Sequence, residues 1–191
     1  MQLDGVLADL ERAGATISAK KSYFGQDRLE VVGYEISAEG RFPNARKASK
    51  IADWPACRNV REVRGFIGLA VYYRIWVFCF AIIAKPLFLL LKDEVEFHWA
   101  EAQERAMQTI KDAITSAPAL ASIDYTSGGQ IYLMVDASAE GGGACIEQVG
   151  HDGKRHPCRF ESTAWSKTES NWHSTKLEAK ALLWALKKFR T

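Results

Sequence analysis

Two carboxylate residues stand where the sequence could support metal chemistry. Asp136 follows the apolar alternation of residues 131–135, so a predicted strand ends there with its carboxylate directed out of the sheet. Glu178 lies on the predicted helix that follows, with no basic residue three or four positions later to form a helix ion pair. Clustered Asp and Glu supply the hard oxygen ligands that Mg²⁺ requires. On the residues alone, commoner roles stay open: a turn former for Asp136 and a solvated surface group for Glu178.

A second group, His151, His156 and Cys158, raises the question of zinc. The predicted turn at Asp152 and Gly153, between two strands, explains why these residues are neighbours without any metal. No fourth ligand stands nearby at a usual zinc spacing. The four cysteines include no Cys-x-x-Cys pair, so neither a zinc module nor a redox motif is indicated.

Charge is distributed in blocks although the net charge is only +2. Residues 41–64 hold seven bases against two acids, residues 92–112 hold six acids against three bases, and residues 151–191 hold nine bases against four acids. Two basic blocks around an acidic one suit a chain that follows phosphates along two surfaces. Ordinary solvated helix faces would give the same blocks, and charge alone does not separate the two interpretations.

The elements that must position these groups change character near residue 127. Before it the pattern is mostly helical, with one extended stretch over residues 29–37, a turn at Glu39 and Gly40, and a hairpin there. Asn59 is the predicted cap of one helix, with Glu62 as its capping-box partner. The other predicted helices cover about residues 3–10, 44–53 and 100–116.

After residue 127 the pattern is strand, strand, strand and helix. Residues 131–136, 141–149 and 155–163 are the predicted strands, and the helix runs from about Ser170 to the end of the chain. The glycines at 141–143 are expected to let a substrate backbone approach closely. No apolar run reaches the roughly 20 residues that a membrane helix needs. With no signal peptide at the start, we expect an intracellular protein, cytoplasmic or nuclear.

Several blocks resemble the Pol polyprotein of gypsy-type LTR retrotransposons, and they occur in that family's order. Residues 66–74 are similar to its thumb motif, residues 32–37 to the hairpin that grips the primer end, and residues 135–138 to the opening of its RNase H domain. The further similar blocks are residues 10–24, 51–55, 84–92, 97–99, 169–172 and 177–190.

The resemblance implies an α+β fold in three segments. Residues 1–40 would be the end of the palm with a primer-grip-like hairpin, and residues 41–127 a mostly helical thumb and connection. Residues 128–191 would be the N-terminal half of an RNase H-like domain, a truncated three-stranded antiparallel sheet with one helix. Asp136 and Glu178 would be catalytic residues and Mg²⁺ ligands, two of the four carboxylates that the family uses. The polymerase aspartates belong to the palm, upstream of Met1.

The function implied is that of a reverse transcriptase and ribonuclease H fragment that is catalytically incomplete on its own. Its expected partner is nucleic acid, either an RNA–DNA hybrid or a template–primer duplex, held mainly through phosphates. The candidate contacts are Gly33, Tyr34, Arg46, Lys47, Lys50, Arg61 and Arg64. The alternative is a repurposed, non-enzymatic module that binds nucleic acid or protein.

One segment departs from the family pattern. After the thumb motif the family has a basic residue and then Phe-Ile-Pro-Asn-Phe, whereas the stretch from Ile75 to Ala84 is apolar here. We therefore expect this stretch, or an unpaired edge of the short sheet, to contact a protein partner or a second copy of the chain. No membrane partner is expected.

Overall fold

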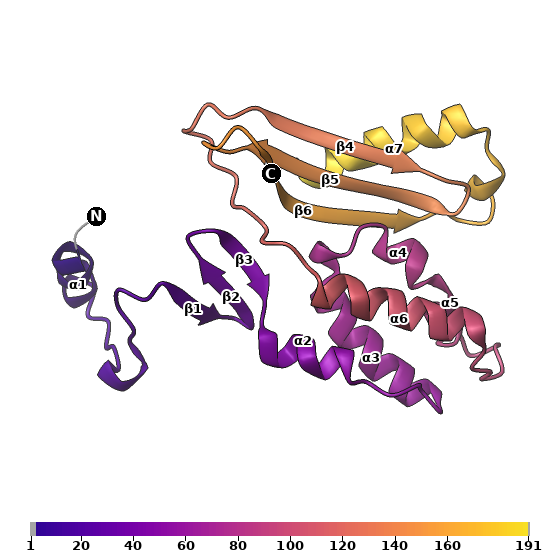
Figure 1. Cartoon of the computed structure of the whole chain (residues 1–191), viewed down its shortest axis with the longest axis horizontal. Coiled ribbons are helices and arrows are strands. Elements are labelled where there is room, and N and C mark those ends of the chain that lie inside the picture. The colour runs from indigo at the N-terminus through magenta and orange to yellow at the C-terminus, as the bar shows by residue number, and fades with distance from the viewer. Residues whose placement is uncertain (1–2, 191) are drawn as a thin grey trace.

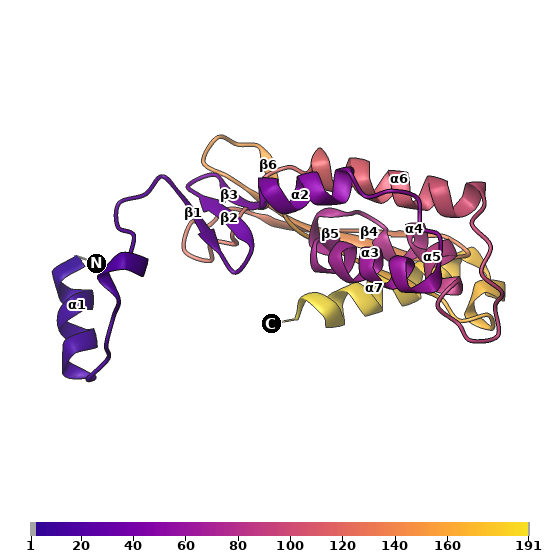
Figure 2. The same cartoon turned by 90° about the horizontal axis from the view of Figure 1, so that it is seen from below.

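The computed structural model describes residues 3–190. Its first element, helix α1 (Leu3–Arg12), has no buried residue and stands apart from the rest in Figures 1 and 2. The expected helix at residues 3–10 is therefore present, without a core of its own, and Met1 lies outside the described residues. A short 3-10 turn, η1 (Ala19–Lys21), links α1 to the first sheet.

The first sheet is a three-stranded antiparallel meander of β1 (Arg28–Val31), β2 (Tyr34–Ser37) and β3 (Gly40–Pro43). The expected single extended stretch over residues 29–37 is wrong, because the chain reverses at Val32 and Gly33. Both residues have positive φ, +48° and +79°, and Val31 pairs with Tyr34 across the two-residue turn. A valine in this conformation is unusual, so sequence propensity gave no signal for the turn.

Helices α2 (Ala45–Ala52), α3 (Val60–Tyr72) and α6 (Glu101–Thr115) build the helical part, together with short helices η2 (Arg74–Trp76), α4 (Phe80–Ile83) and α5 (Lys85–Leu89). The caps follow the sequence. The amide of Glu62 donates to Asn59 Oδ1 at 3.0 Å, and that of Lys47 donates to Asn44 Oδ1 at 3.1 Å. Apolar residues of all six elements form one core.

The apolar stretch from Ile75 to Ala84 is mostly covered by the chain itself. Trp76 and Phe80 are buried in the helical core, and the ring of Phe78 meets that of Phe160 in the second sheet, with centroids 6.2 Å apart. The amide of Ala81 donates to Ser162 Oγ at 2.8 Å. The unusual apolarity therefore joins the helical part to the sheet, while Phe78 keeps 41% of its surface exposed and the expected partner contact stays a prediction.

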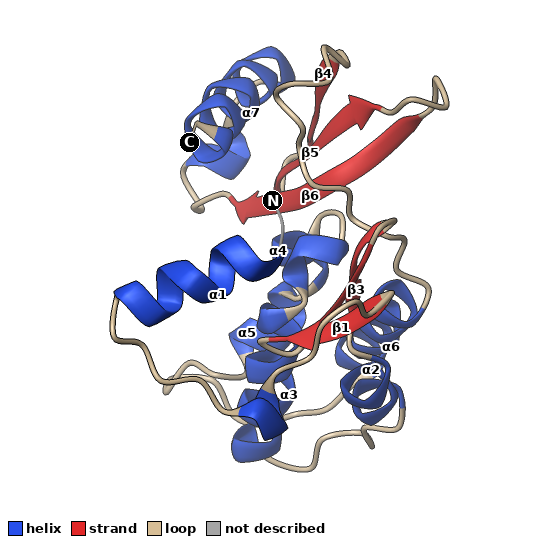
Figure 3. Ribbon diagram, turned by 90° about the vertical axis from the view of Figure 1, so that its left-hand side faces the viewer, coloured by secondary structure: helices blue, strands red, loops and turns tan. Residues whose placement is uncertain are grey.

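The second sheet has the order β4-β5-β6, from β4 (Ile131–Ala137), β5 (Gly141–Val149) and β6 (Arg155–Ala164). All its pairs are antiparallel. A 3-10 turn, η3 (Glu169–Asn171), precedes α7 (Ser174–Phe189), which covers one face of the sheet, while the helical part lies against β6 (Figures 1 and 3). The α+β class, with its three-stranded antiparallel sheet, is confirmed. Among the described residues no helix is long and apolar enough to cross a membrane.

Candidate functional site: a carboxylate pair and a basic helical surface

Asp136 lies one residue before the end of β4 and is exposed. It pairs with Gly143 of β5, so the two residues share one face of the sheet. A Cβ placed on Gly143 would lie 2.5 Å from Cys79 Sγ. Burial raises the pKa of the Cys79 thiol, and the negative charge of the Asp136 carboxylate raises it further. Asp136 therefore faces the side of the sheet on which the segment before α4 packs.

Glu178 stands on α7, which covers the opposite face through contacts of Leu177 and Ala181 with Val135. It lies about 60° around the helix from the centre of the buried stripe, at about 100° per residue. Its side chain is exposed. Within residues 3–190, neither Glu178 nor Asp136 takes part in a hydrogen bond or ion pair with another side chain.

The three glycines that follow Asp136 on β5 serve packing within the chain, which differs from the role expected for them. Residues 141–143 are buried, and their Cβ positions are filled by the protein's own side chains. Gly142 faces Trp165 and Ala181, at 3.1 and 3.3 Å, and Gly143 faces Cys79. The expectation that these glycines admit a substrate backbone is wrong, because they let α7 and the segment before α4 pack closely on β5.

Asp136 and Glu178 carry oxygen donors of the type that Mg²⁺ takes, but Asp136 faces the Cys79 side of the sheet whereas the helix of Glu178 covers the other side. In the part of the chain that the structure describes, no three His, Cys, Asp or Glu side chains gather where they could hold one ion. The same finding covers His151, His156 and Cys158. The described residues therefore do not fit a complete two-metal centre.

The β1–β2 turn is anchored to the end of α3 by two tyrosine hydroxyls. Tyr73 donates to the carbonyl oxygen of Gly33 at 3.1 Å, and Tyr72 donates to that of Val32. The ring of Tyr34 stacks on that of Tyr72 with centroids 4.8 Å apart. Burial raises the pKa of each of Tyr72 and Tyr73 to about 12, so both hydroxyls stay protonated donors at neutral pH. The turn is thus held against the helical part.

The expected phosphate contacts lie on the two helices next to this turn. Arg46 and Lys50 are exposed on α2, and Arg61 and Arg64 are exposed on α3. Lys47 is half-buried, with its Nζ 5.3 Å from the centroid of the Tyr72 ring. None of the five forms an ion pair with another described residue, in contrast to Arg28, Arg105 and Arg159. These five positive charges are therefore available to an external anion.

Sequence reasoning missed a basic and aromatic cluster at the start of α7. The Nζ of Lys176 lies 3.9 Å from the centroid of the Trp172 ring, and that of Lys180 lies 5.0 Å from both Trp172 and Trp165. Lys180 also pairs with Glu169. Trp172, Lys176 and Lys180 follow at intervals of four, so helical spacing could have indicated their contact, whereas Trp165, just after β6, joins them only through the fold. His173 caps α7, its Nδ1 accepting from the amide of Thr175 at 3.4 Å.

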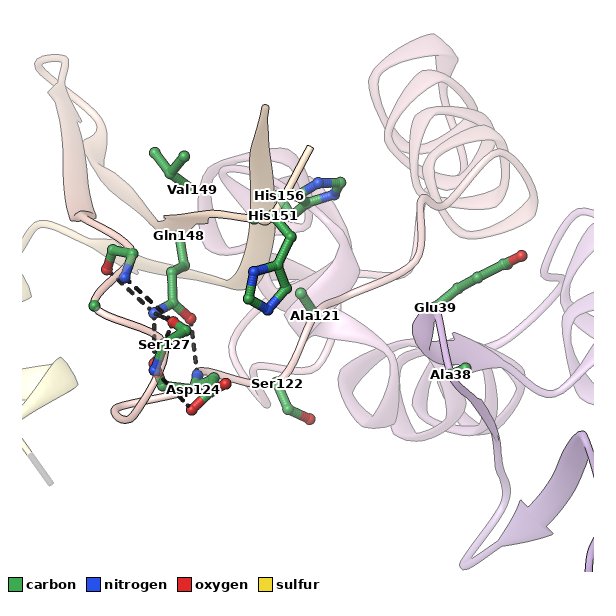
Figure 4. Close-up of a pocket in the computed structure, with 13 residues that line it drawn as sticks. Ala38, Glu39, Ala121, Ser122, Asp124, Ser127, Gln148, Val149, His151 and His156 are labelled. Atoms are coloured by element: carbon green, nitrogen blue, oxygen red, sulfur yellow. Dashed lines mark hydrogen bonds between the residues drawn. The ribbon is translucent and has the colours of Figure 1, made fainter. Parts of the chain in front are cut away.

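A cavity of about 540 Å³ lies beside the β5–β6 hairpin and contains both His151 and His156. Figure 4 shows Gln148 reaching from β5 into the loop that precedes β4, where it bonds Asp124 and Ser127. His156 Nε2 lies 2.9 Å from a carboxylate oxygen of Asp152. The polar groups here largely satisfy one another, so the cavity is a fold feature that ties the loop to the sheet.

Comparison with known proteins agrees with this arrangement. Residues 99–191 match the family described as "RNase H-like domain found in reverse transcriptase". The Tf2-3 transposon polyprotein of Schizosaccharomyces pombe is 31% identical over 185 residues, which make up 97% of this chain and 14% of that polyprotein. The Tf2-12 polyprotein of the same organism gives the same values. The chain thus spans about one seventh of the length of these curated relatives.

Two solved structures share the fold over nearly the whole chain. The foamy viral protease-reverse transcriptase in complex with an RNA/DNA hybrid is 23% identical, with a TM-score of 0.76 over 98% of this chain and 26% of that one. The same enzyme in complex with dsDNA is 24% identical, with a TM-score of 0.79 over 97% of this chain and 39% of that one. At these identities the likeness concerns the fold.

Proposed function

From the RNase H-like domain of the reverse-transcriptase kind at residues 99–191, we propose that the chain is a segment of a gypsy-type retrotransposon reverse transcriptase that holds a nucleic-acid duplex. Residues 1–40 take the part of the palm end with its primer-grip hairpin, residues 41–127 that of thumb and connection, and residues 128–191 that of the first half of RNase H. The duplex is an RNA–DNA hybrid or a template–primer pair, and the site of action is intracellular. The similar fold of the foamy viral enzyme, solved in complex with an RNA/DNA hybrid and with dsDNA, supports this proposal.

One observation carries the proposal: five basic side chains on the adjoining helices α2 and α3 are free of ion pairs within the described chain, and one of them, Lys47, lies beside the anchored β1–β2 turn. Most Lys and Arg side chains of the described chain are unpaired, so the five are distinguished by standing together on two adjoining helices that contain few acids. Unpaired Arg and Lys on adjoining helices are the side chains that contact phosphates without reading sequence. Tyr34 and Gly33 belong to the turn that these helices support, so they lie at the edge of the same surface.

The test is binding of a labelled RNA–DNA hybrid to the chain and to a variant with Arg61→Glu and Arg64→Glu. Both side chains are exposed, so the fold should persist, and the loss of two phosphate contacts should weaken binding by at least about tenfold at low salt. A matched control carries Lys92→Glu and Arg105→Glu, the same change in charge within the acidic block of the sequence. If the two double variants weaken hybrid binding equally, binding depends on net charge alone and the proposed α3 contacts are rejected.

For Asp136 and Glu178 we propose that they are ancestral Mg²⁺ ligands and that binding of the ion is weak or absent in this chain. A bound Mg²⁺ would supply a positive charge near a phosphate of the hybrid. The two side chains alone leave its ligand set incomplete, so no cleavage of an RNA–DNA hybrid is expected. Hybrid cleavage in Mg²⁺ that disappears in Asp136→Asn would contradict this part of the proposal.

A second candidate function is protein binding by a non-enzymatic module. It is favoured by the open edge of β4, where Ile131 and Met134 are exposed, and by a stripe of exposed leucines on α7. The occupant proposed is a second copy of the chain, because an unpaired strand edge is a template for another strand. Light scattering at micromolar concentration should then report a dimer, whereas a monomeric mass would reject it.

A further inference from the structure

A cavity of about 300 Å³ opens between the segment before β4, the second sheet and the end of α7. Three positively charged side chains line it, Arg41 of β3, Arg159 of β6 and Lys188 of α7, and no carboxylate is among its lining residues. The volume is at the lower end of the range for small-ligand pockets. Convergence of three cations without an acid is unfavourable unless an anion joins them.

The two guanidinium groups are incompletely satisfied within the described chain. The Nε atoms of Arg41 and Arg159 are buried and have no hydrogen-bond partner. The Nη2 atom of Arg41 donates to the carbonyl oxygen of Cys158 at a long 3.5 Å. An unpaired buried donor is destabilising, so a group that binds these guanidinium forks would recover part of that cost.

Neighbouring carboxylates neutralise this cluster only in part. Glu161 is buried and bonds Nη2 of Arg159, but it also lies 3.9 Å from Nη2 of Arg74, so two guanidinium groups share one negative charge. The carbonyl groups at the end of α7 oppose an anion, and Lys188 in the last turn offsets them. Arg41 and Lys188 form no ion pair with another described residue.

The walls of the cavity are fixed by backbone hydrogen bonds. Arg41 and Leu120 exchange two bonds of 2.9 Å, and the amide of Ala121 donates to the carbonyl oxygen of Pro157 at 2.8 Å. These bonds clamp the segment before β4 between the first sheet and β6. Tyr125, which follows on this segment, lines the cavity with a side chain that is 73% exposed. The site thus combines preset cations with an accessible aromatic face.

We propose that this pocket binds a phosphate group of single-stranded nucleic acid, whose neighbouring base stacks on Tyr125. Planar guanidinium forks match the geometry of phosphate oxygens, and Lys188 adds a point charge. An exposed tyrosine ring accepts any base, which suits a strand leaving a duplex. The inference extends the proposed function with a second site, separate from α2 and α3, and the two can fail independently.

The test is fluorescence anisotropy of a labelled five-nucleotide oligouridylate with the 191-residue chain. Tyr125→Ala and Lys188→Glu should each lower affinity by about tenfold or more. The control is Lys187→Glu, an exposed neighbour on α7 that does not line the cavity, and it should change affinity less than twofold. Inorganic phosphate and uridine monophosphate should compete, the nucleotide more strongly because it also stacks.

The proposal would be overturned by equal effects of Lys187→Glu and Lys188→Glu, or by full affinity in Tyr125→Ala. If inorganic phosphate and uridine monophosphate compete equally well, the pocket binds anions without base stacking, and the proposal is refuted. Duplex binding separates this site from the helical surface, because Lys188→Glu should leave hybrid affinity within about twofold. If oligouridylate binding is lost in the double variant Arg61→Glu with Arg64→Glu but not in Lys188→Glu, the single-stranded ligand binds at α3 and the pocket is rejected.

Discussion

Replacing Val32 by asparagine should stabilise the protein, although the residue touches a candidate nucleic-acid surface. Val32 has φ +48°, a region where a β-branched side chain is strained, and its side chain is 81% exposed. The left-handed conformation costs an ordinary L-residue about 1–2 kcal/mol, and asparagine tolerates it better. Asn followed by Gly33 is also the preferred pair for a two-residue hairpin turn with positive φ at both positions.

The expected gain in the free energy of unfolding is about 1 kcal/mol, because almost no buried surface is lost with the valine. For a chain of this size that corresponds to a rise in Tm of about 2–4 °C, measurable by circular dichroism. The bond from Tyr72 is unaffected, since it goes to the backbone carbonyl of Val32. Val31→Asn is the control, because Val31 lies in β1 and asparagine is disfavoured in strands. A fall in Tm for both variants would refute the reasoning.

Two further predictions concern packing and pH. Gly143→Ala should lower the free energy of unfolding by about 1–3 kcal/mol, because the added Cβ would lie 2.5 Å from Cys79 Sγ. Cys79→Ala in the same chain should recover part of that loss in a denaturant titration, whereas strictly additive effects would contradict the contact. Because the pKa values of Tyr72 and Tyr73 are raised to about 12 in the fold, stability should fall as pH rises from about 10 towards 12. In the double variant Tyr72→Phe with Tyr73→Phe, the urea midpoint of unfolding should depend less steeply on pH over this range. The same pH dependence in the variant and the original chain would contradict the raised pKa values of the two tyrosines.

The fold was predictable where local chemistry and tertiary packing agree. Asn59 followed by Glu62 predicts a capped helix, and the cap forms, although Glu62 Oε2 accepts from the amide of Arg58. The apolar alternation of residues 131–135 likewise gives β4. The turn at Val32 is not predictable from the sequence, because valine disfavours positive φ. The conformation is stabilised by the hydrogen bond from the Tyr72 hydroxyl to the carbonyl oxygen of Val32, a contact 40 residues away in the sequence.

The sequence predicts which residues form the candidate site and on which elements they stand, but it does not predict how the rest of the chain packs around them. The sequence places Asp136 near a strand end and Glu178 on the next helix, and both are so placed. It could not say which face of the sheet each would occupy, since that depends on packing against α7 and Cys79. For the same reason the glycines at 141–143 were assigned to substrate approach. The pocket at Arg159 joins segments more than 100 residues apart, which no motif encodes.

The segment from Ile75 to Ala84 illustrates how departure from a family pattern is absorbed. Cys79, at the place of the family's asparagine, keeps a left-handed conformation with φ +57°. Asparagine adopts that conformation more readily than cysteine does. Cysteine is therefore less suited to this conformation than the asparagine of the resembled pattern, and the apolar side chains of the segment pack between the helical part and the sheet.

The central claim is that the helical part holds a nucleic-acid duplex through phosphate contacts. The most direct measurement is the affinity for an RNA–DNA hybrid at salt concentrations from about 50 to 200 mM. Five phosphate contacts predict a slope of about −4.5 in log K against log salt, a fall of roughly 500-fold over this range. A slope near zero, or no saturable binding at the lowest salt, would contradict the account.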